Sequence, residues 1–239
     1  AYALGYHQGR FPLSEEEKAT APRHYMEYSG LRERYLEMVR RTVRRYAHDD
    51  RIFCWNIMNE PGANLGGDRT VALLRELFDT VRREDPDQPL CADVWRSIKN
   101  GKISTQEEQV ALELSDVISF HNYGSYPKVV AEIDFLRQYN RPLFLTEWLH
   151  RINHNTVQEI YPLLYITNVS GYCWGFVVGK TQTNEPWDVM WEQWDRGEDH
   201  GYDFTKWQHD LFRPNLRPYD PREIELIENF NRLAEAKEQ

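Results

Sequence analysis

A short apolar run begins at residue 52 and ends in polar residues: Ile52-Phe53-Cys54-Trp55-Asn56-Ile57-Met58-Asn59-Glu60-Pro61. Residues 52–58 have the length and the apolar character of a strand that is buried on both faces, which is typical of parallel sheets. A second run of this kind, Leu143-Phe144-Leu145-Thr146-Glu147, also ends in a glutamate. The sequence therefore predicts two buried strands that each end in a carboxylate.

Amphipathic helices are expected between the apolar runs, because apolar residues recur there at helical spacing. Thr105 and Glu108 form a capping box at the start of one helix, and Asp220-Pro221 marks the start of a closing helix. The expected helices lie at about 31–46, 71–81, 105–114, 127–139, 157–167 and 221–236, and the expected strands at 52–58, 89–95, 117–123, 143–147 and 171–178. Apolar strands separated by helices predict an α/β fold with a parallel sheet covered by helices.

Two architectures share this alternation, a (β/α)8 barrel and a doubly wound sheet. A doubly wound sheet would normally have a glycine-rich turn after an early strand, and this sequence has none. We therefore expect a (β/α)8 barrel of the TIM type. Because no Gly/Ser-rich linker interrupts the chain, a single domain is expected over residues 1–239, with a loop insertion at about 184–203.

Composition and charge exclude several classes of partner. The formal net charge is −9, which would repel a phosphate backbone, so nucleic acid is not expected as a partner. No apolar run approaches the roughly 20 residues that span a bilayer, so no membrane partner is expected. Cys54, Cys91 and Cys173 lie in predicted strands and are expected to be buried thiols rather than disulfide partners. Because no spacing typical of metal ligands accompanies them, neither a metal nor an organic cofactor is predicted.

Polar and aromatic residues gather where the predicted strands end, which is where a barrel builds its site. Glutamates at two separate strand ends, Glu60 and Glu147, suit cleavage of a glycosidic bond, which needs an acid and a second carboxylate at the sugar carbon. Each glutamate alone has an alternative interpretation as an acidic residue favoured by the dipole of a following helix. The other strand ends carry Trp95-Arg96, His121-Asn122-Tyr123, Trp148, Trp174 and Lys180.

The motif at residues 55–61 resembles the Asn-Glu-Pro motif that ends the fourth strand in clan A glycoside hydrolases, and residues 144–148 resemble the end of the seventh strand. Overall the sequence is similar to family 5-like proteins of the cellulase, mannanase or xylanase type. This resemblance implies a retaining hydrolase of β-linked glycans in which Glu60 is the acid/base and Glu147 the nucleophile. The expected partner is therefore an oligo- or polysaccharide substrate.

The same resemblance implies roles for further residues. Asn59 would bind the 2-hydroxyl of the sugar, and Tyr123 would touch the nucleophile. His121 is expected to contact the substrate, and Trp174 matches the tryptophan that forms the floor of the sugar site. Relatives of this type are often exported, which gives the only basis for expecting a secreted or periplasmic protein.

The resemblance also predicts an incomplete barrel. If residues 52–58 form the fourth strand, residues 1–9 are a possible third strand, in which His7 is similar to a histidine of the family. The first two β/α units, with the arginine that braces the nucleophile, have no counterpart in this chain. We therefore expect a catalytic domain of strands three to eight, completed by an N-terminal segment or by a second chain. The alternative function is a catalytically inactive, carbohydrate-binding relic or fragment.

Other residues near the strand ends have less support. Trp95 and Trp148 are expected to stack on sugar rings, and Lys180 to reach substrate hydroxyls. Arg96 has two open interpretations, a pair with a catalytic carboxylate or with a neighbouring acid. Three tryptophans of the predicted insertion could line outer subsites or form a small hydrophobic lid: Trp187, Trp191 and Trp194.

Overall fold

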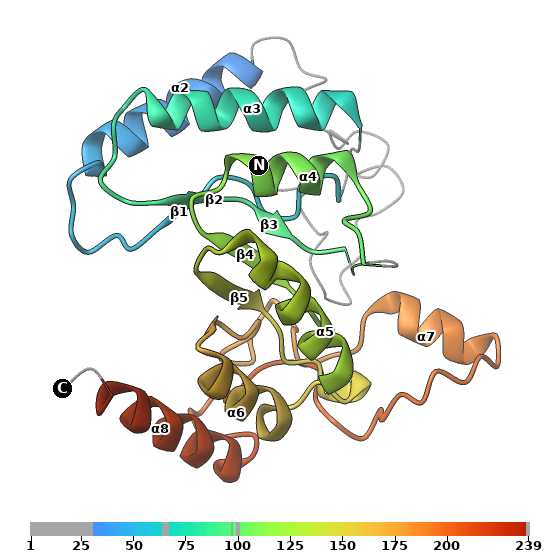
Figure 1. The fold of residues 1–239 in the computed structure, drawn as a ribbon. Coiled ribbons are helices and arrows are strands. Elements are labelled where there is room, and N and C mark those ends of the chain that lie inside the picture. The colour runs from blue at the N-terminus through green and yellow to red at the C-terminus, as the bar shows by residue number, and fades with distance from the viewer. Residues whose placement is uncertain (1–30, 64–66, 97, 99–100, 238–239) are drawn as a thin grey trace. The chain divides into compact units, whose positions relative to one another are not determined.

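The computed structural model describes residues 31–63, 67–96, 98 and 101–237 (Figure 1). Contacts between Cα atoms divide the chain into two compact units. Among the described residues, the first unit holds those up to 121 together with 135–143, and the second holds 122–134 and 144–237. His7 lies outside the described residues.

The first unit consists of helices and short parallel strands. The helices are α2 (Leu31–Tyr46), α3 (Asp68–Arg82) and α4 (Gln106–Leu114), and the strands are β1 (Trp55–Asn56), β2 (Leu90–Cys91), β3 (Asp93–Val94) and β4 (Ile118–His121). Strand β1 pairs in parallel with β2, with Trp55 opposite Leu90, and β3 pairs in parallel with β4, with Asp93 opposite Ser119. Because β3 and β4 are parallel, His121 at the end of β4 lies at the same edge of the sheet as the residues that follow β3.

Helices α2, α3 and α4 enclose the core of this unit. On α3, Leu74, Phe78 and Val81 recur at helical spacing and are almost completely buried. They form one cluster with residues from the neighbouring helices and strands: Val43, Leu90, Ala92, Val110 and Ala111. Each buried side chain of this size contributes about 1.5–3 kcal/mol by removal from water, so this cluster fixes the strands that carry the site.

The Thr105 N-cap at the start of α4 is confirmed, whereas the Glu108 carboxylate of the predicted capping box supports the end of β3. The backbone N–H of Glu108 donates to Thr105 Oγ1 at 3.3 Å. The Glu108 carboxylate turns inward and accepts from the backbone N–H groups of Trp95 (2.9 Å) and Arg96 (2.6 Å). Glu108 is fully buried, so the loop that follows β3 is held by a carboxylate from the first turn of the next helix.

The second unit continues the alternation of strands and helices. It contains most of α5 (Tyr126–Leu136) and β5 (Leu143–Glu147), followed by α6 (Val157–Thr167), β6 (Ser170–Gly171), α7 (Asp188–Asp195) and α8 (Pro221–Glu235). A short 3-10 turn lies at Arg151–Asn153 in this unit, and another lies at Arg137–Tyr139 in the first unit. Strand β5 pairs in parallel with β6, with Leu145 opposite Gly171. Helices α6 and α8 pack side by side (Figure 1).

A buried ion pair connects α8 to the segment that follows β5. The guanidinium of Arg151 donates to both carboxylate oxygens of Glu223, at 2.8 and 2.6 Å. It also donates to the carbonyl oxygens of His209 and Asp210 and lies over the Tyr219 ring. Arg151 and Glu223 are each 3% exposed. Nothing in the sequence pattern singled out either residue, because they lie far apart in the chain.

The α/β fold is confirmed, since parallel strands alternate with helices throughout the described residues. The expected helices are present, and β5 has the predicted bounds, but β1 and β6 are shorter than the apolar runs that contain them. The prediction of a loop at 184–203 is wrong in part, because residues 188–195 form α7. The strands of the described residues close no barrel, so a barrel of strands three to eight in a single domain stays a prediction. Among the described helices, none is both long and apolar enough to cross a membrane.

Candidate active site

Glu60 lies in a turn with unusual backbone geometry after β1. Its φ angle is 43°, in the left-handed region that residues other than glycine seldom adopt. Neighbouring contacts hold the turn: the indole N–H of Trp95 donates to the carbonyl of Pro61 (3.0 Å), and Arg96 donates to that of Gly62 (3.1 Å). Strained backbone of this kind occurs preferentially at functional sites, where surrounding contacts maintain it.

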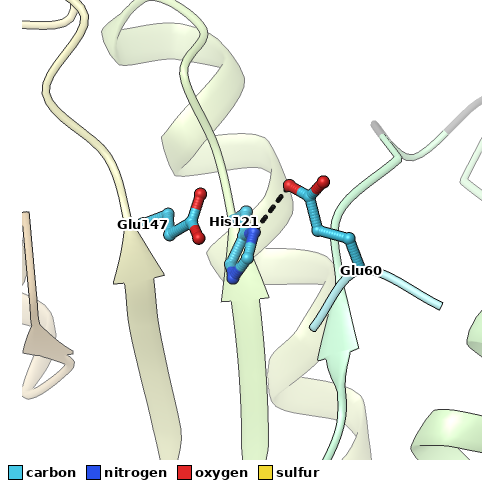
Figure 2. A group of neighbouring side chains, drawn as sticks. All are labelled: Glu60, His121 and Glu147. Carbon is cyan, nitrogen blue, oxygen red and sulfur yellow. Dashed lines mark hydrogen bonds and ion pairs between the residues drawn. The ribbon is translucent and has the colours of Figure 1, made fainter. Parts of the chain in front are cut away.

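The side chain of Glu60 meets His121 within the first unit. His121 Nδ1 lies 2.9 Å from Glu60 Oε1, which is a hydrogen-bond distance (Figure 2). His121 is the last residue of β4 and is buried, whereas the side chain of Glu60 is partly exposed. The histidine thus orients a carboxyl group that retains access to solvent. Direct contact of His121 with a substrate stays a prediction.

Asp93 is a member of this site that the sequence interpretation did not include. It is the first residue of β3 and is completely buried. Its Oδ1 accepts from the amide of Asn56 at 2.8 Å and from the hydroxyl of Ser119, and lies 3.5 Å from His121 Nε2. Burial alone would raise the pKa of Asp93, but hydrogen bonds from His121, Ser119 and Asn56 outweigh it and hold the pKa below its ordinary value. The sequence feature that could have pointed to Asp93 is that it is an acidic residue inside an otherwise apolar predicted strand.

Glu147 is held within the second unit by a tyrosine. It ends β5, as Figure 2 shows, and its Oε2 accepts a 2.6 Å hydrogen bond from the hydroxyl of Tyr123. The backbone N–H of Asn122 donates to the carbonyl of Glu147 at 3.0 Å. The backbone bond fixes the neighbouring segment against the end of β5, so that the phenol reaches the carboxylate. The prediction that Tyr123 touches Glu147 agrees with this contact.

Rings from distant segments surround Tyr123. Trp187 packs edge-on at 5.4 Å between ring centroids, His150 lies edge-on at 5.9 Å, and His209 lies at 5.3 Å. Burial lowers the pKa of His150 to about 3, with a contribution from His209, and burial lowers the pKa of His209 to about 4. Both imidazoles are therefore neutral at pH 7. The cluster holds the Tyr123 ring in an apolar, uncharged setting.

The other predicted site residues differ in their exposure and in their contacts. Trp95 is partly buried, with the Arg96 guanidinium 4.4 Å from its ring centroid. The side chain of Arg96 donates to the backbone carbonyl of Gly62. Asn59 and Lys180 are exposed, and Trp174 is partly exposed. The predicted contacts of these three residues with a substrate stay predictions.

The prediction that Trp148 stacks on sugar is wrong. Its side chain is 1% exposed and its ring packs at 6.0 Å from that of Tyr161 on α6. A ring covered on its faces by protein has none to offer a sugar. The side chains of successive strand residues point to opposite faces, and after Glu147 the next side chain turns into the core.

Comparison with known protein families identifies the class to which this α/β chain belongs, the glycoside hydrolases. The family described as Cellulase (glycosyl hydrolase family 5) matches residues 7–197. The chain therefore belongs to glycosyl hydrolase family 5, a family of glycoside hydrolases, and the resemblance inferred from the motifs is confirmed. A comparison with curated proteins gives no match.

Solved structures share the fold at low sequence identity. A β-D-glucuronidase from Dictyoglomus thermophilum is 16% identical with a TM-score of 0.57, over 85% of this chain and 36% of that one. A Streptomyces cattleya GH5_18 protein in complex with Manb1-4GlcNAc is 12% identical with a TM-score of 0.55, over 88% of this chain and 56% of that one. XacCel5A in complex with cellopentaose is 12% identical with a TM-score of 0.51, over 86% of this chain and 70% of that one. This chain thus spans about a third of the glucuronidase and somewhat more than half of the Streptomyces protein.

Proposed function

We propose that this chain is the catalytic part of a retaining glycoside hydrolase that cleaves β-linked glycans, with Glu147 as nucleophile and Glu60 as acid/base. Membership of glycosyl hydrolase family 5 supports the reaction class. The observation that carries the assignment of residues is that each glutamate follows a parallel strand and is oriented by a ring residue, Glu60 by His121 and Glu147 by Tyr123.

The reaction proceeds by two displacements. In the first, a Glu147 oxygen forms a bond to the anomeric carbon while the glycosidic C–O bond breaks, and Glu60 gives its proton to the leaving oxygen. In the second, Glu60 takes a proton from water, the water oxygen bonds to the anomeric carbon, and the bond to Glu147 breaks. Retention requires the two carboxyl groups to lie about 5–5.5 Å apart in the working enzyme.

The contacts of the two glutamates suit these different roles. The phenol of Tyr123 donates to Glu147 and so stabilises an ionised carboxylate, which is the form that attacks. Glu60 instead faces an imidazole nitrogen that can accept or donate a proton. One carboxyl group is therefore stabilised as an anion, and the other has a partner for proton exchange, as the mechanism requires.

The variant Glu147→Gln tests the assignment, because an amide of the same shape cannot attack the anomeric carbon. We expect it to abolish turnover of an aryl β-glycoside while the far-ultraviolet circular dichroism stays unchanged. Glu192→Gln, at an exposed site on α7, is the matched control and should keep full turnover. Undiminished turnover in Glu147→Gln would end the assignment.

A second candidate is a carbohydrate-binding relic, in which the same strand-end residues would bind a glycan without cleaving it. Calorimetry with short β-glucans and β-mannans separates the two functions. Heat of binding without any product, in a protein of native circular dichroism, would favour the relic, whereas product formation would exclude it.

The barrel proposal extends to the first two β/α units, which an N-terminal segment or a second chain would supply. Support comes from the order of the motifs, in which the run at residues 52–58 resembles the fourth strand of the family. Light scattering of the purified protein tests the second-chain form: a stable oligomer supports it, and a monomer with full turnover rules it out.

A further inference from the structure

Asp93 is a fully buried carboxylate that the double-displacement mechanism does not use. Its Oδ2 accepts from the backbone N–H of Glu60 at 3.4 Å, and its Oδ1 accepts from Asn56 and Ser119. Burying a carboxylate is costly unless hydrogen bonds or charges compensate. The Asn56 amide, the Ser119 hydroxyl and the backbone N–H of Glu60 supply three compensating hydrogen bonds, and His121 supplies the remaining contact.

His121 lies between this charge and the proposed acid/base. Its Nε2 is 3.5 Å from Asp93 Oδ1, and its Nδ1 is 2.9 Å from Glu60 Oε1. The two nitrogens of one ring thus face two carboxyl groups from different strand ends. In such an arrangement the partner of one nitrogen determines which nitrogen carries the proton.

We propose that Asp93 is a positioning residue that keeps a proton on His121 Nε2, so that Nδ1 is the atom that exchanges a proton with Glu60. This inference rests on the proposed acid/base role of Glu60. The pair of Glu60 and His121 then shares one mobile proton. The proton sits either on Glu60 Oε1, with Nδ1 as acceptor, or on Nδ1, with Glu60 ionised, while Asp93 stays ionised in both states.

Proton transfer within the pair is balanced and needs no other reactant. When Glu60 has protonated the leaving oxygen, its charge is negative, and the ring that faces it keeps Nε2–H toward Asp93. When Glu60 takes a proton from water in the second step, the pair returns to its original protonation. The fixed tautomer means that His121 need not turn its ring between the two steps.

The proposal also depends on the charge of the groups that surround Asp93, His121 and Glu60. Cys91 on β2 is a neighbour of Asp93, and its hydrogen bond with Cys54 together with burial raises its pKa, so it stays neutral. Glu60 faces Nδ1 and Asp93 faces Nε2, and Ser119 carries no charge.

Nuclear magnetic resonance of ¹⁵N-histidine-labelled protein tests the proposal without any need for activity. The His121 signals are assigned by their loss in His121→Asn. We expect the wild-type ring to show a protonated Nε2 across neutral pH. A neutral ring with the proton on Nδ1 would overturn the proposal, and this wild-type measurement does not depend on the folding of a variant.

Asp93→Asn provides the second arm, with Ser119→Ala as the matched control that removes one hydrogen bond but keeps the charge. The ring shifts of His121 should change in Asp93→Asn and stay near wild type in Ser119→Ala. Removal of the negative charge also lets the shared proton leave more easily, so the basic limb of the kcat/KM profile should move to lower pH by about 1 unit. Unchanged ring shifts in a folded Asp93→Asn would contradict the proposal.

The outcomes separate this inference from the proposed function. A wild-type protein without turnover would count against the hydrolase, whereas its His121 shifts would still decide the tautomer. Turnover with superimposable pH profiles for wild type and Asp93→Asn would leave the hydrolase intact and reject the role of Asp93.

Discussion

The hydroxyl of Tyr123 donates a 2.6 Å hydrogen bond to Glu147 Oε2, across 24 positions of sequence. The bond is short, as expected when the acceptor is charged. The ring that makes it is packed by Trp187, His150 and His209. The orientation of the proposed nucleophile therefore depends on the packing of an uncharged ring cluster.

Tyr123→Phe should lower kcat/KM for an aryl β-glycoside by roughly 10- to 100-fold. The estimate follows because a hydrogen bond to a charged group contributes about 1.5–3 kcal/mol. Steady-state kinetics measure the effect, and the thermal midpoint shows whether the ring cluster still packs. Equal kcat/KM in the variant and the wild type would mean that the bond does not support the attacking carboxylate.

Arg151→Met should destabilise the second unit by about 3–5 kcal/mol, because it leaves Glu223 as an uncompensated buried charge. Arg196→Met, which removes the exposed partner of Glu198, is the matched control and should leave the urea midpoint close to that of the wild type. Urea denaturation followed by circular dichroism gives both values. Similar losses of stability in the two variants would show that the buried pair contributes no more to stability than the exposed pair.

Stability should fall as the pH drops from about 6.5 toward 4, in part because of His150 and His209. Burial lowers their pKa values to about 3 and about 4 in the folded protein. Below the ordinary histidine pKa, the unfolded chain binds protons that the folded chain excludes, so each group can contribute up to about 1.4 kcal/mol per pH unit within this window. Above pH 6.5 both imidazoles are neutral in the folded and in the unfolded chain, so neither group lowers the stability there.

The variant His150→Gln isolates one of these groups. Its urea midpoint should decline less steeply between pH 6.5 and 4 than that of the wild type, because glutamine does not titrate. Parallel declines would show that His150 is protonated in the folded protein.

Trp194→Ala should weaken binding of a long β-glycan by roughly 3- to 10-fold and leave turnover of a small aryl glycoside unchanged. Trp191 and Trp194 follow Trp187 at helical spacing, and Trp194 is 61% exposed, which speaks against a buried lid. Phe204 stacks on Trp191 and meets Trp194 edge-on. Affinity electrophoresis in a polysaccharide gel measures the loss. If the variant and the wild type are retarded equally by the polysaccharide gel, Trp194 does not bind the glycan.

Local signals predicted the helices well. The capping box of Thr105 and Glu108 and the Asp220-Pro221 start both act over a few residues, so their geometry can be inferred from sequence. Strand lengths were predicted less well, because pairing depends on partners that lie far along the chain. The run at 171–178 was predicted to be one strand, and only Ser170–Gly171 pairs as β6. Residues 188–195 were missed as a helix because the aromatic and acidic segment around them suggested an insertion.

The sequence by itself determined the alternation of strands and helices, the family, and the position of Glu60 and Glu147 after strands, since these depend on short-range patterns and motifs. Only the tertiary structure decided the partners of the ionisable groups. Asp93 meets Asn56, Ser119 and His121 from separate segments, and Arg151 finds Glu223 at a separation of 72 residues. Such pairings come from packing of distant segments, which no local pattern encodes, and for the same reason Trp148 proved to be buried.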